Sequence, residues 1–182
     1  MIDLRRCKLY TEQVSKAIRF VCNLTPALGN QMKLYYSPGS CSLSPHIALQ
    51  EAGLAYSLEK VDLRTKITAS GADFTQINTK GSVPTLELDN GELLTEGPAI
   101  VQWIADQAPA ANLAPANGTF ARARLQEMLN YIGTEVHKSY GPLFSPIADD
   151  ATKAAAIAKI QSKYQWIEAK LAGQDYLLGD TF

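Results

Sequence analysis

Residues 80–97 read KGSVPTLELDNGELLTEG, and they carry the strongest short-range indication of a fold in the chain. The tripeptide Asp89-Asn90-Gly91 predicts a tight turn, since Asn-Gly readily adopts the left-handed backbone that a hairpin turn needs. Strand-forming residues flank the turn, which predicts a hairpin of strands over 83–88 and 92–95. Pro84 cannot donate to a central ladder, so it fits only the start or edge of a strand.

The segments on either side of the hairpin complete an α/β unit. The sequence predicts a strand over 33–37, a helix ending at Gly53, a strand over 56–63, a loop over 67–72, a short helix over 73–78 and a helix over 98–106. For the first helix, Ser42 or Ser44 is the expected cap and Pro45 stands in the first turn. The order is β-α-β followed by β-β-α, with a right-handed crossover between the first two strands. This order predicts a thioredoxin-like fold.

The chain becomes all-helical after a turn-rich linker over 107–118. Two long helices are predicted over 119–140 and 151–172, ended by Gly141-Pro142 and by Gly173. Their expected core positions are Leu125, Met128, Leu129, Ile132 and Val136 in the first helix, and Ile157, Ile160, Tyr164, Ile167 and Leu171 in the second. The predicted class is therefore α/β plus α. Its expected parts are an extension over 1–31, a thioredoxin-like domain over 32–109 and an all-helical domain over 117–182.

Composition excludes several classes of protein. Of 182 residues, 46% are hydrophobic and 19% charged, with 17 basic against 18 acidic residues, so the chain is neither disordered nor strongly charged. A nucleic-acid binder normally carries a basic face, and a membrane helix needs roughly 20 apolar residues in a row. Three cysteines without paired spacing argue against a disulfide framework. We expect a cytoplasmic protein that binds neither nucleic acid nor membranes.

Residues 1–31 differ from the rest. Lys16 and Arg19 interrupt their apolar region, so they do not fit a signal peptide. Their arginines leave a transit peptide open, although serine is scarce. We interpret the segment as an extension outside the core, or as the product of a start upstream of Met32.

Cys41 is the leading candidate for chemistry. It is predicted between a strand and a helix, where exposed amides and the positive helix end favour a thiolate. The string Cys41-Ser42-Leu43-Ser44 is C-x-x-S, so the thiol can form a mixed disulfide but has no neighbouring thiol to resolve it. The alternative is an inert buried cysteine.

Three further features accompany Cys41. Val83, before Pro84, can offer its backbone to an extended ligand, or the proline is an ordinary turn residue. Glu96-Gly97 adds a carboxylate and amides at a helix start, or Glu96 is only a dipole partner. His137 can transfer a proton, or it is a surface histidine. The histidines and cysteines lack metal-ligand spacing, and no nucleotide-binding glycine motif occurs.

Four segments resemble the bacterial beta-class glutathione S-transferases. They are MKLYYSPGSCSLS at 32–44, KGSVP at 80–84, LTEG at 94–97 and NYIGTEVHK at 130–138. The resemblance covers residues 32–182 and implies a homodimer that takes glutathione as co-substrate and needs no other cofactor. It implies that Cys41, His137 and Tyr36 are catalytic. The glutathione-binding residues that it implies are Cys41, Lys66, Val83, Pro84, Glu96, Gly97, Asn130, Thr134, Glu135, His137 and Lys138.

The reaction implied is the conjugation of glutathione to small hydrophobic electrophiles. In the family, the final string Leu178-Gly179-Asp180-Thr181-Phe182 leads into a further buried helix, so we expect a helical domain that is incomplete. Two alternatives stay open. One is glutathione-dependent thiol–disulfide exchange through Cys41, and the other is a non-catalytic glutathione-binding module.

Overall fold

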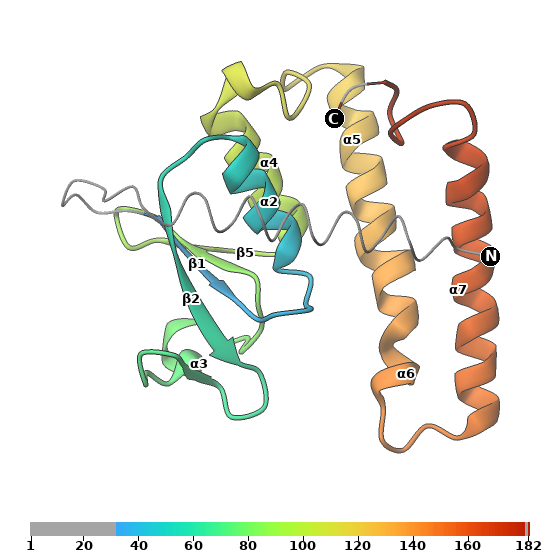
Figure 1. Ribbon diagram of the computed structural model, residues 1–182, viewed down its shortest axis with the longest axis horizontal. Coiled ribbons are helices and arrows are strands. Elements are labelled where there is room, and N and C mark those ends of the chain that lie inside the picture. The colour runs from blue at the N-terminus through green and yellow to red at the C-terminus, as the bar shows by residue number, and fades with distance from the viewer. Residues whose placement is uncertain (1–31, 181) are drawn as a thin grey trace. The chain divides into compact units, whose positions relative to one another are not determined.

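The computed structural model describes residues 32–180 and 182. The interpretation of residues 1–31 as an extension lies outside the described residues. The remainder begins with a sheet unit, which is followed by helices (Figure 1). Within the part that the structure describes, no helix is both long and apolar enough to cross a membrane.

The sheet has five strands in the order β3-β2-β1-β4-β5. Their bounds are Met32–Tyr36 for β1, Tyr56–Asp62 for β2, Ile67–Thr68 for β3, Thr85–Glu87 for β4 and Leu93–Thr95 for β5. Strand β1 pairs with β2 in parallel and with β4 antiparallel, and β4 pairs with β5 antiparallel. This topology confirms the predicted β-α-β and β-β-α order.

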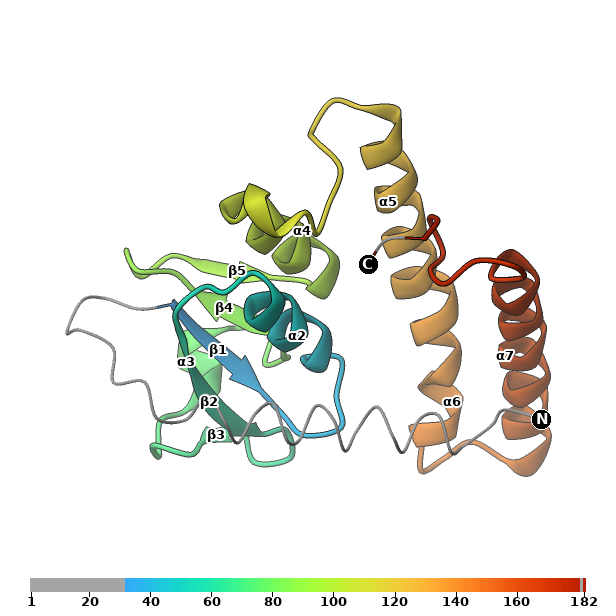
Figure 2. The ribbon, with the colours of Figure 1, turned by 45° about the horizontal axis from the view of Figure 1, so that its top comes forward.

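Three helices cover the sheet. Helices α2 (Leu43–Glu51) and α4 (Gly97–Gln107) lie side by side on one face, and α3 (Phe74–Ile77) lies on the other (Figures 1 and 2). Strand periodicity sends Leu34 toward the first face and Tyr35 toward the second. Helix α2 ends before Gly53, whose positive φ of 64° favours glycine.

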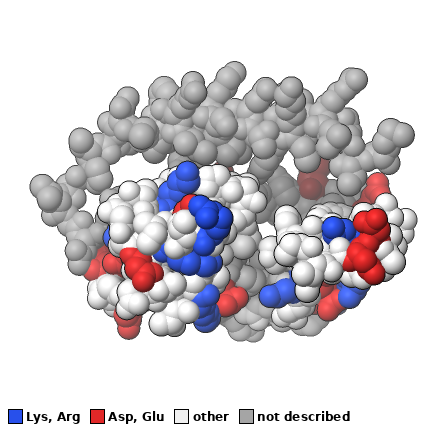
Figure 3. Space-filling view, turned by 90° about the horizontal axis from the view of Figure 1, so that it is seen from below, with Lys and Arg blue, Asp and Glu red and all other residues white. Residues whose placement is uncertain are grey.

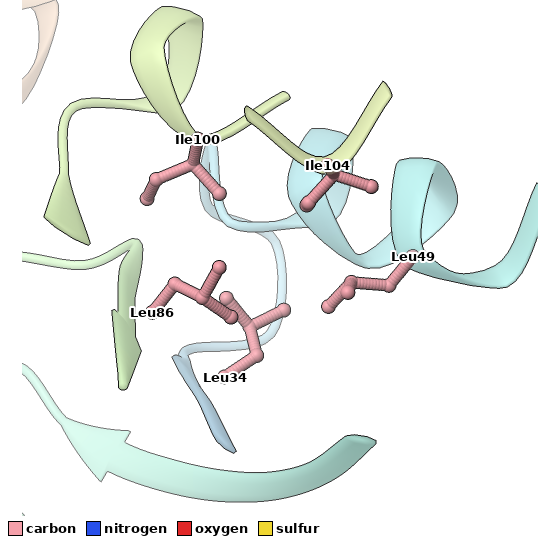
Figure 4. Close-up of a cluster of buried hydrophobic side chains, with 5 residues drawn as sticks. All are labelled: Leu34, Leu49, Leu86, Ile100 and Ile104. Atoms are coloured by element: carbon pink, nitrogen blue, oxygen red, sulfur yellow. The ribbon is translucent and has the colours of Figure 1, made fainter. Parts of the chain in front are cut away.

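The main core lies between the sheet and the α2–α4 pair. Leu34 and Leu86 point up from the strands toward three aliphatic side chains of the helices (Figure 4). All five are fully buried, namely Leu34, Leu49, Leu86, Ile100 and Ile104. A leucine or isoleucine truncated to alanine in such a core costs about 2–5 kcal/mol, so this cluster supports the whole sheet unit.

Two local predictions in the sheet unit need correction. The segment expected to be a loop over 67–72 begins with the short strand β3, because Val61 and Asp62 pair with Thr68 and Ile67. Ser42 stands at the N-cap of α2, but its hydroxyl does not cap the helix. It instead accepts a hydrogen bond from the amide of Ser37 and donates to the carbonyl of Ser37, both at 3.2 Å.

The helical part follows the 3₁₀ turn η1 (Pro109–Ala111) and differs from the prediction in its first helix. Helix α5 (Phe120–Tyr131) gives way to the π-helical segment η2 (Ile132–Val136) and the 3₁₀ segment η3 (His137–Tyr140). Gly141-Pro142 does not end the helical path, since α6 (Gly141–Phe144) starts there and proline needs no amide partner in a first turn.

Helix α7 (Asp150–Lys170) packs against this irregular segment and lies beside α5 in both views (Figures 1 and 2). Ile160 is buried as expected, but Ile157 and Tyr164 are 45% and 39% exposed, and Ile132 of η2 is 39% exposed. The predicted apolar stripes are therefore only partly covered. Helix α7 packs against η2, η3 and α6 on one side, and part of its apolar surface stays exposed.

Candidate functional site

A cleft of about 620 Å³ lies between the sheet unit and the irregular helical segment. It is lined by Gly39, Ser40, Cys41, Leu63, Lys66, Gly81, Ser82, Val83, His137, Tyr140 and Phe144. Four of the predicted site residues, Cys41, Lys66, Val83 and His137, thus meet at one place. Three come from loops of the sheet unit and the fourth comes from η3.

Cys41 is held just before the N-terminus of α2 by the loop that precedes the helix. Ser40 donates to the carbonyl of Ser37 at 2.8 Å and shares a hydrogen bond with the hydroxyl of Ser42 at 2.7 Å. Ser42 is only 1% exposed, so this hydroxyl network lies under the loop and leaves Cys41 on the surface. The thiol of Cys41 donates to the carbonyl of Val83 at 3.5 Å, which links the two predicted features directly.

Val83 precedes strand β4, and the Val83–Pro84 peptide bond is cis. Asn78 fixes the loop from within, because its amide donates to the carbonyl of Ser82 and to the hydroxyl of Thr85, both at 2.9 Å. Asn78 is 5% exposed, and its hydrogen bond to Thr85 is buried. The backbone of Val83 is therefore presented to the cleft from a rigid loop.

Lys66 and Glu96 share an unusual backbone conformation. Their φ angles are 61° and 72°, in the left-handed region that side chains other than glycine rarely adopt. The ammonium of Lys66 donates to the carbonyl of Gly81 at 2.8 Å, and Glu96 forms an ion pair with Lys80 at 3.2 Å. Strained backbone of this kind is typical of functional positions.

The other predicted residues of the sheet unit, Tyr36, Pro84, Glu96 and Gly97, are outside the cleft lining, and Tyr36 packs against the main core. Pro84 follows Val83 and is buried, and Gly97 begins α4 close to the ring of Pro84. The ring of Tyr36 lies 6.4 Å from that of His46, which stands 5.6 Å from the ring of Tyr56. Burial lowers the pKa of His46.

Four predicted residues of the helical part are outside the cleft lining, and all of them are exposed. The hydroxyl of Thr134 in η2 donates to the carbonyl of Asn130 in α5 at 3.0 Å. Glu135 accepts a hydrogen bond from Lys163 of α7 at 2.6 Å, and this hydrogen bond lowers the pKa of the carboxyl. Lys138 follows His137 in η3.

Sequence reasoning missed part of the cleft wall. Tyr140 and Phe144 follow His137 at intervals of three and four residues, so helical spacing alone could have indicated them. The hydroxyl of Tyr140 donates to that of Tyr164 at 3.0 Å, which fixes the ring against α7. Leu63 lies just beyond β2, and no pattern in the sequence marked it.

The charges near the cleft suit an anionic ligand. Lys66 lines the cleft, and basic side chains gather over the sheet unit on the face seen in Figure 3, with acidic ones beside them. Among the described residues, no group of three or more His, Cys, Asp or Glu side chains is placed to hold a metal ion. The cleft thus offers a thiol, an imidazole, an ammonium and the backbone of Val83, whose carbonyl accepts from Cys41.

Comparisons with known proteins agree with this chemistry. The family model of the glutathione S-transferase N-terminal domain matches residues 39–107. The chain is 42% identical over 151 residues to glutathione S-transferase GstA of Escherichia coli O157:H7, covering 83% of this chain and 75% of that protein.

Solved structures give the same result. The ternary complex of BphK, a bacterial glutathione S-transferase, has a TM-score of 0.80 and 54% identity, covering 82% of this chain and 75% of that one. A sphingomonad glutathione S-transferase complexed with glutathione has a TM-score of 0.80 and 48% identity, with the same coverage of 82% and 75%. Both likenesses extend through the sheet unit and the helices.

Proposed function

Because the chain belongs to the bacterial glutathione S-transferase family, as the four sequence segments predicted, we propose that its cleft conjugates glutathione to small hydrophobic electrophiles. The observation that carries the proposal is the meeting of Cys41, Lys66, Val83 and His137 in one cleft. These residues come from both parts of the fold, so the site forms only when the two parts pack together.

Glutathione is an extended peptide with two carboxylates and one ammonium, and the cleft together with Glu96, outside its lining, supplies a partner for each kind of group. The backbone of Val83 can pair with the peptide as an added strand. The ammonium of Lys66 carries three N–H donors, of which one goes to Gly81, so it can also bind a carboxylate. The carboxylate of Glu96 is suited to the ammonium of the ligand, with the amide of Gly97 at the same helix start.

The reacting sulfur lies, in this proposal, between Cys41 and His137. The glutathione thiol gives its proton to the imidazole of His137 as its sulfur forms a bond with the electrophilic carbon. The leaving group departs with its electron pair, or an activated double bond takes up the proton. The thiol of Cys41 can donate a hydrogen bond to the glutathione sulfur and stabilise its negative charge.

The electrophile would contact the outer part of the same cleft. Leu63, Tyr140 and Phe144 give this part an apolar wall, and Phe144 is 82% exposed. Burying such a side chain against an apolar electrophile is favourable by roughly 25 cal/mol per Å² of area removed from water. This wall supports hydrophobic substrates over charged ones.

A homodimer in the cytoplasm completes the proposal. The family resemblance supports the dimer, and the three cysteines without a paired spacing support a reducing compartment. Asn130, Thr134, Glu135 and Lys138 retain their predicted part in glutathione binding here, although they are outside the cleft lining. Sedimentation velocity of the full chain tests the dimer, and a single monomeric species would contradict it.

The test of the function is conjugation of glutathione to a chlorodinitrobenzene by the full chain. We expect product formation that saturates with glutathione and falls by about tenfold or more in the double variant Lys66→Met/His137→Ala. Circular dichroism of both proteins shows whether they are equally folded. A folded parent chain that makes product no faster than the reagents alone would overturn the proposal.

A further inference from the structure

An exposed ion pair joins Lys80, which precedes the cleft-lining Gly81, to Glu96, which follows β5. The ammonium of Lys80 stands 3.2 Å from a carboxylate oxygen of Glu96, and it donates to the hydroxyl of Thr95 at 2.9 Å. The side chains of Lys80 and Glu96 are 55% and 70% exposed. An ion pair as exposed as this contributes about 1 kcal/mol or less to folding, so fold stability does not account for it.

The fold fixes both members of the pair beside the cleft. Lys80 directly precedes Gly81, which lines the cleft, and its own amide donates to the side chain of the buried Asn78 at 3.0 Å. Thr95 pairs with Thr85 across the hairpin. Because the strands are antiparallel, Glu96, the residue after β5, is opposite Pro84, the residue before β4. The two charges are therefore carried by residues adjacent in the chain or in the hairpin register to Gly81 and Pro84, which flank Ser82 and Val83 of the cleft lining.

The two charges of the pair complement those of an amino acid head group. An α-amino acid carries an ammonium and a carboxylate on one carbon atom, and Glu96 and Lys80 present the opposite charges side by side. A ligand of this kind replaces one ion pair with two, each a charge-assisted hydrogen bond. The backbone of Glu96 has a positive φ of 72°, and its carboxylate is paired with Lys80.

We infer that Lys80 is a ligand-binding residue, which holds the α-carboxylate of the γ-glutamyl group while Glu96 holds the α-ammonium. This assignment rests on the proposed function and deepens it. Selectivity for the zwitterionic end of glutathione then comes from the pair, because neither charge alone distinguishes an amino acid from a simple amine or acid. Lys66 remains available for the carboxylate at the other end of the tripeptide.

Isothermal titration of the full chain with three tripeptides tests the assignment. The first is glutathione, the second is γ-aminobutyryl-cysteinyl-glycine, which lacks the α-carboxylate, and the third is glutaryl-cysteinyl-glycine, which lacks the α-ammonium. The variants are Lys80→Gln, Lys80→Arg and the control Lys170→Gln, which removes an exposed lysine of α7.

We expect Lys80→Gln to raise the dissociation constants of glutathione and of the glutaryl peptide by about two- to fivefold. An exposed charge pair contributes about 1 kcal/mol or less, which corresponds to a change of this size. The γ-aminobutyryl peptide should bind no more weakly than to the parent chain. Lys80→Arg should restore most of the affinity, and Lys170→Gln should bind all three peptides as the parent does.

Three results would overturn the assignment. An equal loss of affinity for all three peptides in Lys80→Gln would mean that Lys80 only supports the loop. Tighter binding of glutathione to Lys80→Gln would mean that Lys80 competes with the ligand for Glu96. Unchanged binding of glutathione to Lys80→Gln would remove Lys80 from the site and leave the proposed function intact. A parent chain that binds no glutathione would overturn both proposals together.

Discussion

The guanidinium of Arg122 on α5 donates two parallel hydrogen bonds to the carboxylate of Asp106 on α4, at 2.9 and 2.7 Å. A further hydrogen bond, of 2.9 Å, goes to the carbonyl of Pro115 in the linker. Arg122 is 3% exposed, so its charge depends on these partners. The pair joins α4 of the sheet unit to α5, the helix that leads into η2 and η3.

Replacing Asp106 with asparagine should lower the free energy of unfolding by about 2 kcal/mol, because a buried guanidinium loses its counter-charge. The value is lower than for a fully buried pair, since the side chain of Asp106 is 36% exposed. Urea unfolding measures the change. Arg122→Met should lower the free energy of unfolding by less than Asp106→Asn does, because it leaves no buried charge. The opposite order would show that the arginine stabilises the fold through packing.

The same pair predicts a response to acid. The hydrogen bonds from Arg122 lower the pKa of Asp106, so the unfolded chain takes up a proton at a higher pH than the folded one. Its stabilising effect is thus present in full above the ordinary aspartate pKa of about 4 and is lost as the pH falls through the lowered value. Unfolding of the parent and of Asp106→Asn should converge at low pH, and a constant difference would contradict this.

His46 predicts a second pH dependence, nearer neutrality. Burial lowers its pKa, so folding opposes its protonation. Stability should be unaffected above about pH 6.5 and should fall as the pH drops from there toward the lowered folded-state pKa. The melting temperature of His46→Phe, which keeps a ring beside Tyr36 and Tyr56, should lose this slope. The control His137→Asn leaves His46 in place, so its melting temperature should still fall as the pH drops.

His137→Asn should lower kcat for conjugation by about tenfold or more, because asparagine cannot accept the thiol proton. The KM for glutathione should change little if Lys66 and Val83 supply most of the binding. Steady-state kinetics with glutathione varied at a fixed electrophile concentration separates the two constants. If the chemical step limits kcat in the parent chain, an unchanged kcat in His137→Asn would show that another group takes the proton.

Cys41 should form a mixed disulfide with oxidised glutathione. Its sulfur attacks one sulfur of the oxidised peptide, and one molecule of reduced glutathione leaves. Intact mass and peptide mapping should place a single adduct on Cys41, and Cys41→Ala should lack it while retaining part of the conjugation activity. Adducts confined to Cys7 and Cys22 would show that the thiol of Cys41 is not accessible at this site.

The sheet unit was predictable because its information is local. Asn90-Gly91 defines the hairpin, and Gly53 has the positive φ that ends α2. The short strand β3 was not predictable, because its two residues are strand-like only through pairing with Val61 and Asp62. The break of the long helix after Tyr131 was not predictable either, because apolar periodicity does not distinguish α-helix from the π-helical and 3₁₀ segments that follow and contact α7.

The sequence by itself determined the element order, the family and the importance of Cys41, since these follow from turn residues, strand and helix periodicity, and motifs read along the chain. Only the tertiary structure decided that Cys41, Lys66, Val83 and His137 share a cleft with Tyr140 and Phe144. It also showed the pairing of Lys80 with Glu96 and of Arg122 with Asp106. The physical reason is that such contacts join residues far apart in the chain, and packing of the two parts sets their distances.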